Sequence, residues 1–437
     1  MAHIFRCSAL SAALVICASA ASAQSGRPER PYRGLFGGGV GDVGQILTVT
    51  GSAGAGFSND LVAEVRGGTA PRPGRSWQGG LGAASGSVNY SLQGNRVTWS
   101  AAGATGARYY PSLTRDFVRG SQVRTSLSFA LLPSTSLSAG VSAAHQPHWL
   151  GGVVPTEAET EDQPLNNLDF AAGLESYATY SGSIGLAHRR QLSKRTSLAA
   201  SYGYRKAVVP DRQRAFDRQS AGGVLTRAVA QGLHLRGGYS YAHADYGSGR
   251  TSGVHLIDAG VDYSKPLSIS RRTTVSFATG SSAIRQRGQV RFRLNGSASL
   301  RHELGRTWTA SAAYSRRVAL HDAWDDPVLS DGVSLGVSGL IGRRLQFTAR
   351  ASSALGGIGT EENAPIFRTV HGSAALAYAA TRFVNFSMTY SYYQHRFGDG
   401  ALPTLGSPRT LDRQSLRATV SLWAPVFQRA RRINASR

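Results

Sequence analysis

Apolar and polar side chains alternate with a period of two residues through much of this chain. Over residues 384–392 one set of alternate positions is apolar or aromatic, and the other is asparagine, serine or threonine. Over residues 291–301 the apolar set includes Phe292 and Leu294, whereas Arg291 and Arg293 belong to the other set. Because successive side chains of a strand point to opposite faces, the pattern predicts strands with one apolar wall and one polar wall. A sheet of this kind fits between lipid and water.

Short turn signals divide these strands into hairpins. They lie near Gly94, Ser134, Lys194, Gln231, Ser268, Gly305, Gly342 and Ala380. From Lys194 onward they are roughly 37 or 38 residues apart, which is the length of two spanning strands and one loop. Longer polar segments alternate with them, at 150–176, 206–218, 320–331, 357–365 and 397–412. Short periplasmic turns alternating with long outer loops are typical of outer-membrane barrels.

We therefore expect an all-β fold, a transmembrane antiparallel up-and-down β-barrel of about 18 strands over residues 43–427. The first strand and the segment 219–230 alternate least clearly, so roughly 16 strands is the alternative count. A secreted β-solenoid also spaces its strands regularly, but it would not alternate short and long connections. Aromatic residues near both strand ends predict two interfacial girdles, formed by Trp99, Trp308 and Phe383 near the short turns and by Tyr109, Tyr110, Tyr204, Tyr239, Tyr241, Tyr392, Tyr393 and Phe397 near the loops.

The amino terminus predicts export. Arg6 precedes an apolar stretch, and the small residues Ala21-Ser22-Ala23 form a peptidase site, so we expect a signal peptide over 1–23 with cleavage after Ala23. Both cysteines, Cys7 and Cys17, lie in this segment, and we expect no disulfide and no cysteine metal ligand in the mature chain. A short periplasmic leader over 24–42 would precede the barrel, and a basic tail over 428–437 would follow it. The predicted location is the bacterial outer membrane.

The charge balance points to anionic partners. The formal net charge is +23, and arginine supplies nearly all of the positive charge. The arginines are spread along the whole chain rather than gathered with aromatic residues on one platform, which argues against nucleic-acid binding. For an exported barrel we expect outer-membrane lipid, lipopolysaccharide head groups and anionic solutes as partners, together with the barrel-assembly machinery during biogenesis. A homo-oligomer is an open alternative to a single barrel.

Over nearly all of its mature length the chain resembles the general outer-membrane porins. The long segment 150–176 joins the fifth and sixth expected strands, as does the inward-folded third loop of those porins. The resemblance implies that acidic residues of this segment narrow a pore opposite arginines of the wall; they are Glu157, Glu159, Glu161, Asp162 and Asp169. The alternative is that this segment is an exposed, solvated surface loop. By alternation, the arginines expected on the inner wall are Arg96, Arg124, Arg205, Arg236, Arg291, Arg293, Arg317 and Arg350. The expected inner carboxylates are Asp258, Asp262 and Glu303.

Two catalytic motifs match by letter alone. Gly39 to Gly44 fits the dinucleotide pattern but enters a strand rather than a helix, and Gly332 to Gly336 fits the hydrolase pattern inside an alternating strand. The histidines are scattered among different strands. We therefore expect no enzymatic activity, no catalytic residues, no metal and no cofactor.

These observations predict a porin-like channel for the passive diffusion of small polar or anionic solutes. Rings of arginine in a water-filled barrel raise the local concentration of anions. One alternative is a non-conducting or gated barrel linked to polysaccharide export or to cell-surface structure. A second is an outer-membrane barrel hydrolase, which would need a base within reach of a nucleophile.

Overall fold

In the computed structural model the chain forms one closed antiparallel sheet of 18 strands. The structure describes residues 43–59, 78–111, 117–147, 178–209, 214–247, 251–267, 270–286, 289–319, 327–359, 366–398 and 410–430. The strands are β1 Val43–Ser58, β2 Gly79–Gln93, β3 Val97–Tyr109, β4 Phe117–Leu132, β5 Thr135–Pro147, β6 Ala178–Ser193, β7 Thr196–Val209, β8 Arg214–Ala230, β9 Leu233–Asp245, β10 Thr251–Leu267, β11 Ser270–Gln286, β12 Gln289–Leu304, β13 Trp308–Ala319, β14 Val328–Ile341, β15 Leu345–Ile358, β16 Ile366–Ala379, β17 Val384–Phe397 and β18 Thr410–Ala430.

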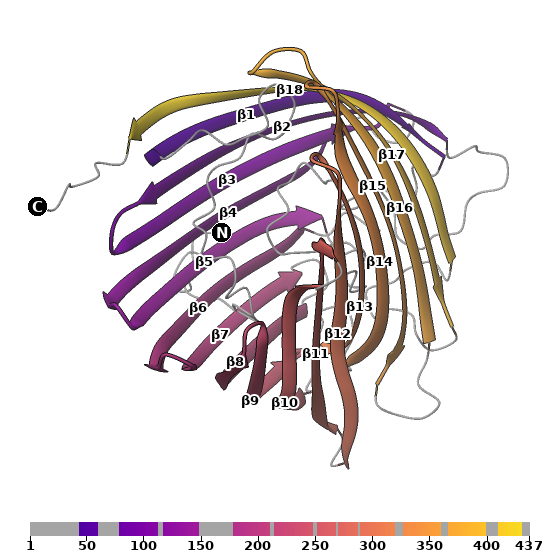
Figure 1. Cartoon of the computed structure of the whole chain (residues 1–437). Helices are drawn as coiled ribbons and strands as arrows, with labels where there is room; N and C mark the ends of the chain where they lie inside the picture. The colour runs from indigo at the N-terminus through magenta and orange to yellow at the C-terminus, as the bar shows by residue number, and fades with distance from the viewer. Residues whose placement is uncertain are drawn as a thin grey trace, which may run out of the picture.

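Each strand pairs with its neighbours in sequence, and the first strand pairs with the last. β1 pairs with β2 on one side and with β18 on the other, which closes the barrel. In Figure 1 the strands pass from indigo through magenta and orange to yellow, and yellow β18 returns to lie beside indigo β1. Closure leaves no edge strand with unpaired backbone groups, as a sheet in lipid requires. The predicted up-and-down barrel of 18 strands is confirmed.

The predicted short turns lie at one end of the barrel, which we call the turn end. Gly232, Gly305 and Gly342 have φ values of 77°, 75° and 69° there. Glycine adopts this left-handed conformation without the steric penalty of a side chain, so hairpins of this length close readily. The opposite end, where the longer connections leave the sheet, we call the loop end. In outer-membrane barrels with this architecture the short turns face the periplasm.

Several predicted boundaries differ from the structure; the predicted loop 320–331, for example, includes the first four residues of β14. Most of the predicted loop 206–218 is strand, because β7 continues to Val209 and β8 begins at Arg214. The weakly alternating segment 219–230 is therefore part of a 17-residue strand. At the carboxyl end, Gln428 still pairs with Ile46, so β18 includes the first residues of the predicted tail. Residues 1–42, which include the predicted signal peptide and leader, and residues 431–437 lie outside the described residues.

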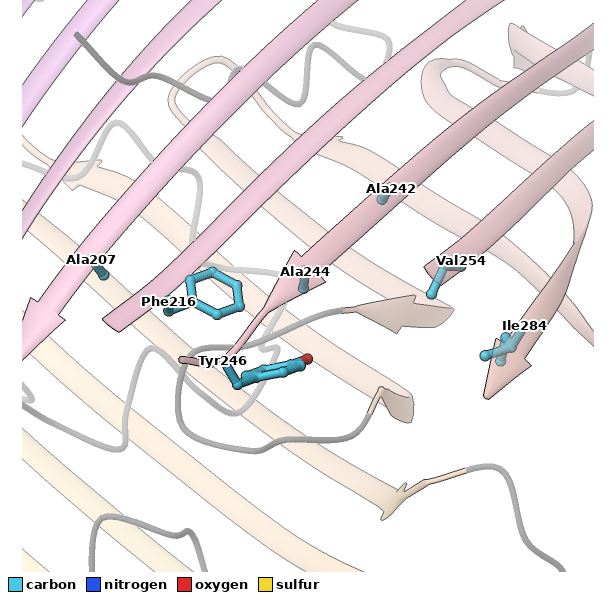
Figure 2. Packing of buried hydrophobic residues seen from close by; sticks show 7 residues of the cluster. All are labelled: Ala207, Phe216, Ala242, Ala244, Tyr246, Val254 and Ile284. Carbon is cyan, nitrogen blue, oxygen red and sulfur yellow. The ribbon is translucent and has the colours of Figure 1, made fainter. Parts of the chain in front are cut away.

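Buried apolar side chains gather inside the barrel near the loop end. One cluster joins β7 to β11 and contains Ala207, Phe216, Ala242, Ala244, Tyr246, Val254 and Ile284. Figure 2 shows Phe216 and Tyr246 together at the ends of their strands, and their ring centroids are 5.4 Å apart. Among the described residues no helix is long and apolar enough to cross a membrane.

Candidate functional site: the inner wall

The two faces of the sheet differ in side-chain size and polarity. On β12 the outer face carries Phe292 and Leu294, whose side chains are 68% and 74% exposed, while Arg291 and Arg293 at the alternate positions are partly buried. Partners across two antiparallel strands lie on the same face, so the strand register extends this assignment around the barrel. Large apolar side chains exposed on one face of nearly every strand form a belt, as the lipid-facing surface of a membrane barrel does.

Serines pair across strands on the inner wall. The Oγ atoms of Ser52 and Ser85 are 2.6 Å apart, and those of Ser391 and Ser415 are also 2.6 Å apart. Ser142 and Ser183 form another such hydrogen bond. Small hydroxyl side chains make this wall polar. A barrel of this size is wide enough for an aqueous channel.

Seven of the eight predicted arginines lie on this inner wall by register. Arg124 lies opposite Ser142, Arg293 opposite Ser282, and Arg317 opposite Ser330. Further cross-strand pairs have Arg205 opposite Ser183, Arg291 opposite Ile284, Arg350 opposite Ser373 and Arg236 opposite Gly260. Their strands, from β4 to β15, occupy much of the circumference of the barrel. The structure therefore brings positive charge to many sides of one lumen.

Arg96 is not part of this wall. It is exposed in the turn between β2 and β3, where its backbone carbonyl accepts a hydrogen bond of 2.7 Å from the N–H of Ala130. The alternation rule failed here because the chain leaves the sheet after Gln93 and re-enters it at Val97. A position in a turn has no fixed face, so counting in twos from the strand does not assign one.

Arg236 forms an ion pair on the inner wall. Its Nη1 donates to Oδ1 of Asp262 at 2.9 Å, and its Nη2 donates to the carbonyl oxygen of Thr279 at 3.3 Å. Asp262 was predicted to face inward, and its register opposite His234 agrees with that. Glu303 lies opposite Thr309, near the turn end of β12. The side chain of Asp258 and the whole acidic segment with Glu157, Glu159, Glu161, Asp162 and Asp169 lie outside the described residues.

The inner wall also carries arginines that were not predicted. Arg108, Arg218, Arg413 and Arg417 lie on it by register, all toward the loop end of their strands. Arg108 and Arg413 are only 3% and 5% exposed. Alternation would have assigned Arg108, Arg413 and Arg417, since serine, threonine, alanine or glycine stands two residues away from each. Arg218 was hidden because its segment was interpreted as a loop.

Arg108 is the most isolated of these charges. Among the described residues its Nε, Nη1 and Nη2 are buried without a hydrogen-bond partner. Arg413 donates through Nε to Oγ of Ser58 at 3.4 Å, across the β18–β1 closure. A buried guanidinium without a compensating group attracts anions strongly, because its charge has lost hydration.

Part of the predicted loop-end girdle lies inside the barrel. Tyr110, Tyr393 and Phe397 are buried on the inner face, together with His395 and Phe367. His395 hydrogen-bonds to Thr369 through Nδ1 and lies with its ring 3.9 Å from the ring of Phe397. Tyr109, Tyr204, Tyr239, Tyr241 and Tyr392 remain on the outer face by register. Adjacent strand residues point to opposite faces, so the two members of Tyr109-Tyr110 and of Tyr392-Tyr393 cannot both face the lipid. The prediction was wrong in assigning both members to one girdle.

The described residues of the two sequence motifs, 332–336 and 39–44, do not have the geometry of a catalytic site. Ser334 lies in the middle of β14, opposite Ala313 and Ser352 on the inner wall, and the strand continues regularly past Gly336. A hydrolase presents this serine on a sharp turn between a strand and a helix. Most of the other motif, residues 39–42, lies outside the described residues. Within the part of the chain that the structure describes, no group of three or more histidine, aspartate or glutamate side chains could hold a metal ion.

The closed sheet with its exposed apolar belt is the fold of a transmembrane β-barrel. No protein-family model matches the chain, and no curated protein matches it. Solved barrels resemble it in structure. A mutant of the ferric enterobactin receptor PfeA from Pseudomonas aeruginosa has a TM-score of 0.44 and 10% identity, covering 86% of this chain and 80% of the receptor. OpdQ from the same organism has a TM-score of 0.43 and 11% identity, covering 88% of this chain and 98% of OpdQ. The siderophore receptor PirA from Acinetobacter baumannii has a TM-score of 0.43 and 10% identity, over 86% of this chain and 80% of PirA.

Proposed function

We propose that the barrel is a passive, anion-preferring diffusion channel for small polar or anionic solutes. The observation that carries the proposal is the charge of the inner wall, where arginines from strands around the barrel outnumber the described carboxylates. Low-dielectric walls concentrate the field of such charges and raise the local concentration of anions. The wall between the arginines is mostly serine, glycine and alanine, which leaves room for water. The proposal assigns no catalytic step to the barrel.

The acidic segment 157–169 remains a predicted constriction. Carboxylates there would lie across the lumen from arginines and would reduce the preference for anions while narrowing the path. Changing Glu157, Glu159, Glu161 and Asp162 to serine should then raise conductance and strengthen anion preference. Unchanged conductance would place the segment at the surface instead.

The main test is ion selectivity in a planar bilayer. We expect the refolded mature protein to give steady openings and a reversal potential that favours chloride over potassium. In Arg291→Ser/Arg293→Ser the anion preference should weaken. A unit charge about 8 Å from an ion in water changes its energy by about 0.5 kcal/mol, so two losses should lower the permeability ratio by up to about fivefold.

A matched control removes the same charge from the opposite face. Arg190 and Arg227 lie on the outer face, opposite Thr135 and Thr196, so Arg190→Ser/Arg227→Ser should leave selectivity unchanged. A preference for potassium in the unmodified protein would contradict the proposal. A folded barrel that never conducts would favour the non-conducting or export-linked alternative.

A further inference from the structure

Two arginines stand opposite each other on the outer face of the barrel. Arg368 of β16 and Arg396 of β17 are direct cross-strand partners, and both are exposed. Their neighbours Phe367 and Phe397 are buried on the inner face, which fixes the outward direction of the arginines. Like charges directly opposite each other destabilise a strand pair. An anion between the two charges would relieve this repulsion.

The described carboxylates nearby have hydrogen-bond or ion-pair partners other than these two arginines. Asp331 lies 3.8 Å from Nε of Arg316 and accepts a hydrogen bond of 2.6 Å from the hydroxyl of Tyr314. Asp412 accepts a hydrogen bond of 3.4 Å from Nε2 of Gln394. The ion pairs among the described residues do not include Arg368 or Arg396. The amide hydrogen bond leaves the negative charge of Asp412 in place, but no described carboxylate is within ion-pair distance of Arg368 or Arg396, and both guanidinium groups are exposed at this surface.

The height of the pair places it at the edge of the lipid layer. At ~3.3 Å per residue and a strand tilt of ~45°, the segment from Ala379 to Arg368 rises roughly 26 Å, about the height of the apolar band of such barrels. Leu355 and Ile366, beside the pair on the outer face, are 53% and 57% exposed. Below it on β17, Tyr390 and Met388 are 42% and 52% exposed. The surface is cationic at the head-group level and apolar below.

We propose that Arg368 and Arg396 bind a phosphate group of lipopolysaccharide in the outer leaflet. Guanidinium groups form paired, charge-assisted hydrogen bonds to phosphate, and two of them side by side can hold one phosphate from both sides. The acyl chains of the same lipid lie along Met388, Tyr390 and the neighbouring apolar residues. The site is independent of the proposed channel, because it lies on the other face of the wall.

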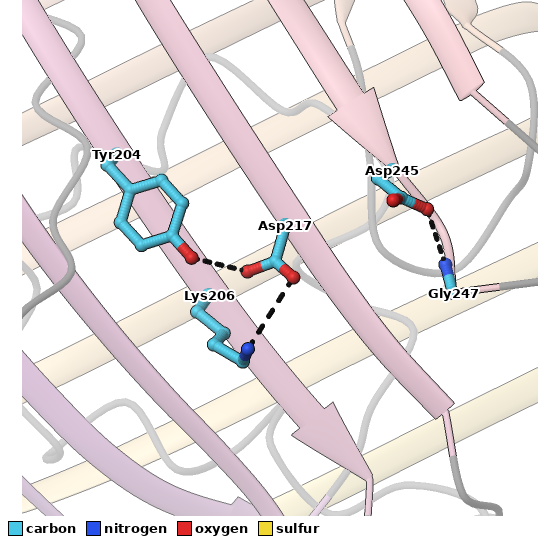
Figure 3. A network of polar contacts seen from close by, with 5 residues as sticks. All are labelled: Tyr204, Lys206, Asp217, Asp245 and Gly247. Atoms are coloured by element: carbon cyan, nitrogen blue, oxygen red, sulfur yellow. Dashed lines mark hydrogen bonds and ion pairs between the residues drawn. The ribbon is translucent and has the colours of Figure 1, made fainter. Parts of the chain in front are cut away.

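The site is confined to one side of the barrel. On the outer face of β7 and β8, Oδ2 of Asp217 lies 3.6 Å from Nζ of Lys206, and Oδ1 accepts a hydrogen bond of 2.7 Å from the hydroxyl of Tyr204 (Figure 3). Charge there is neutralised within the protein, so that surface offers no comparable phosphate site. The outer arginines at the turn end, Arg190 and Arg227, are not opposite each other.

The test is a binding titration by native mass spectrometry of the refolded barrel in detergent. The probes are lipid A with both phosphates, the same lipid without phosphates, and phosphatidylglycerol. We expect lipid A with phosphates to bind, and Arg368→Ser/Arg396→Ser to weaken this binding about tenfold or more, since charge-assisted hydrogen bonds are lost. The control Arg190→Ser/Arg227→Ser should bind as the unmodified protein does.

Two further comparisons decide the chemistry of the site. Arg368→Lys/Arg396→Lys keeps the charge but not the planar fork, so its affinity should fall between those of the unmodified protein and the serine variant. This variant also keeps the test valid if the serine variant does not refold. Equal binding of lipid A with and without phosphates, equal loss in the Arg190/Arg227 control, or phosphatidylglycerol binding as tightly as lipid A would overturn the proposal.

Discussion

The inner and outer faces of the wall use the same residue type in different surroundings. On the inner face, Arg293 lies opposite Ser282 and beside small polar side chains. On the outer face, Arg368 lies opposite another arginine, as Arg205 does on the inner face, but it lies beside exposed Leu355. Inner arginines stand along the length of the wall, whereas the unneutralised outer pair lies at the edge of the apolar belt. A water-filled lumen tolerates charge at any depth, while lipid tolerates it only at the head groups. On the outer face, the position of a charged side chain along the strand therefore indicates where the lipid head groups lie. On the inner face it gives no such information.

The largest expected effect comes from placing an inner side chain on the outer face. Leu335 and Ser334 are adjacent in the middle of β14, and Leu335 is 55% exposed on the outer face while Ser334 faces inward. Leu335→Arg should lower the free energy of unfolding by about 2–4 kcal/mol, because it places a charge near the bilayer midplane. Ser334→Arg should cost less than about 1 kcal/mol, because a hydrated lumen can solvate the new charge. Urea unfolding of both variants in lipid vesicles measures the difference.

Equal destabilisation by the two variants would break the comparison. It would mean that the lumen around Ser334 is dry, so that an arginine there is no better solvated than in lipid. A dry lumen would also contradict the proposed channel. An unfolding free energy close to that of the unmodified protein for Leu335→Arg would instead contradict the assignment of the lipid-facing belt.

Alternation predicted the faces well because the register rarely shifts. Among the described strand pairs, closure from β1 to β18 keeps Ser52 opposite both Ser85 and Ser421, so one parity holds around the barrel. The rule failed where the backbone leaves the sheet, at Arg96, and where polar residues made a strand resemble a loop, at Arg218. It could not indicate that Arg368 and Arg396 face each other, because register across a hairpin depends on the turn geometry. The length of β16, the turn and β17 together determines that pair.

A smaller effect is expected from the paired arginine of the inner wall. Asp262→Asn leaves Arg236 without its ion pair, and the two side chains are 17% and 30% exposed. Partial exposure moderates the cost, so we expect a loss of about 1–2 kcal/mol in the free energy of unfolding. The variant also adds a net positive charge to the lumen, so its anion preference should rise. Bilayer reversal potentials and urea unfolding measure the two effects separately.

Asp262→Asn sharpens the comparison because stability and selectivity should move in opposite directions. The double variant Arg236→Ser/Asp262→Asn removes both partners and should recover part of the lost stability. It should also return the selectivity close to that of the unmodified protein. A fall in anion preference for Asp262→Asn would show that this carboxylate does not contribute to the field in the lumen.

The smallest effect is expected where the outer face neutralises its own charge. Lys206 and Asp217 are 41% and 32% exposed and 3.6 Å apart, and Tyr204 also holds the carboxylate. Exposed pairs of this kind contribute about 0–1 kcal/mol, and salt screens them. Lys206→Met should therefore change the free energy of unfolding by less than about 1 kcal/mol, and the change should shrink further in ~1 M salt. It should leave lipid A binding unaltered, since the lysine is already paired and lies on strands far around the barrel from Arg368.

If Lys206→Met weakened lipid A binding as much as the Arg368/Arg396 variant does, lipid A would not distinguish charges that are paired within the protein from charges that are not. The difference between the outer surface of β7 and β8 and that of β16 and β17 would then not determine where lipid A binds.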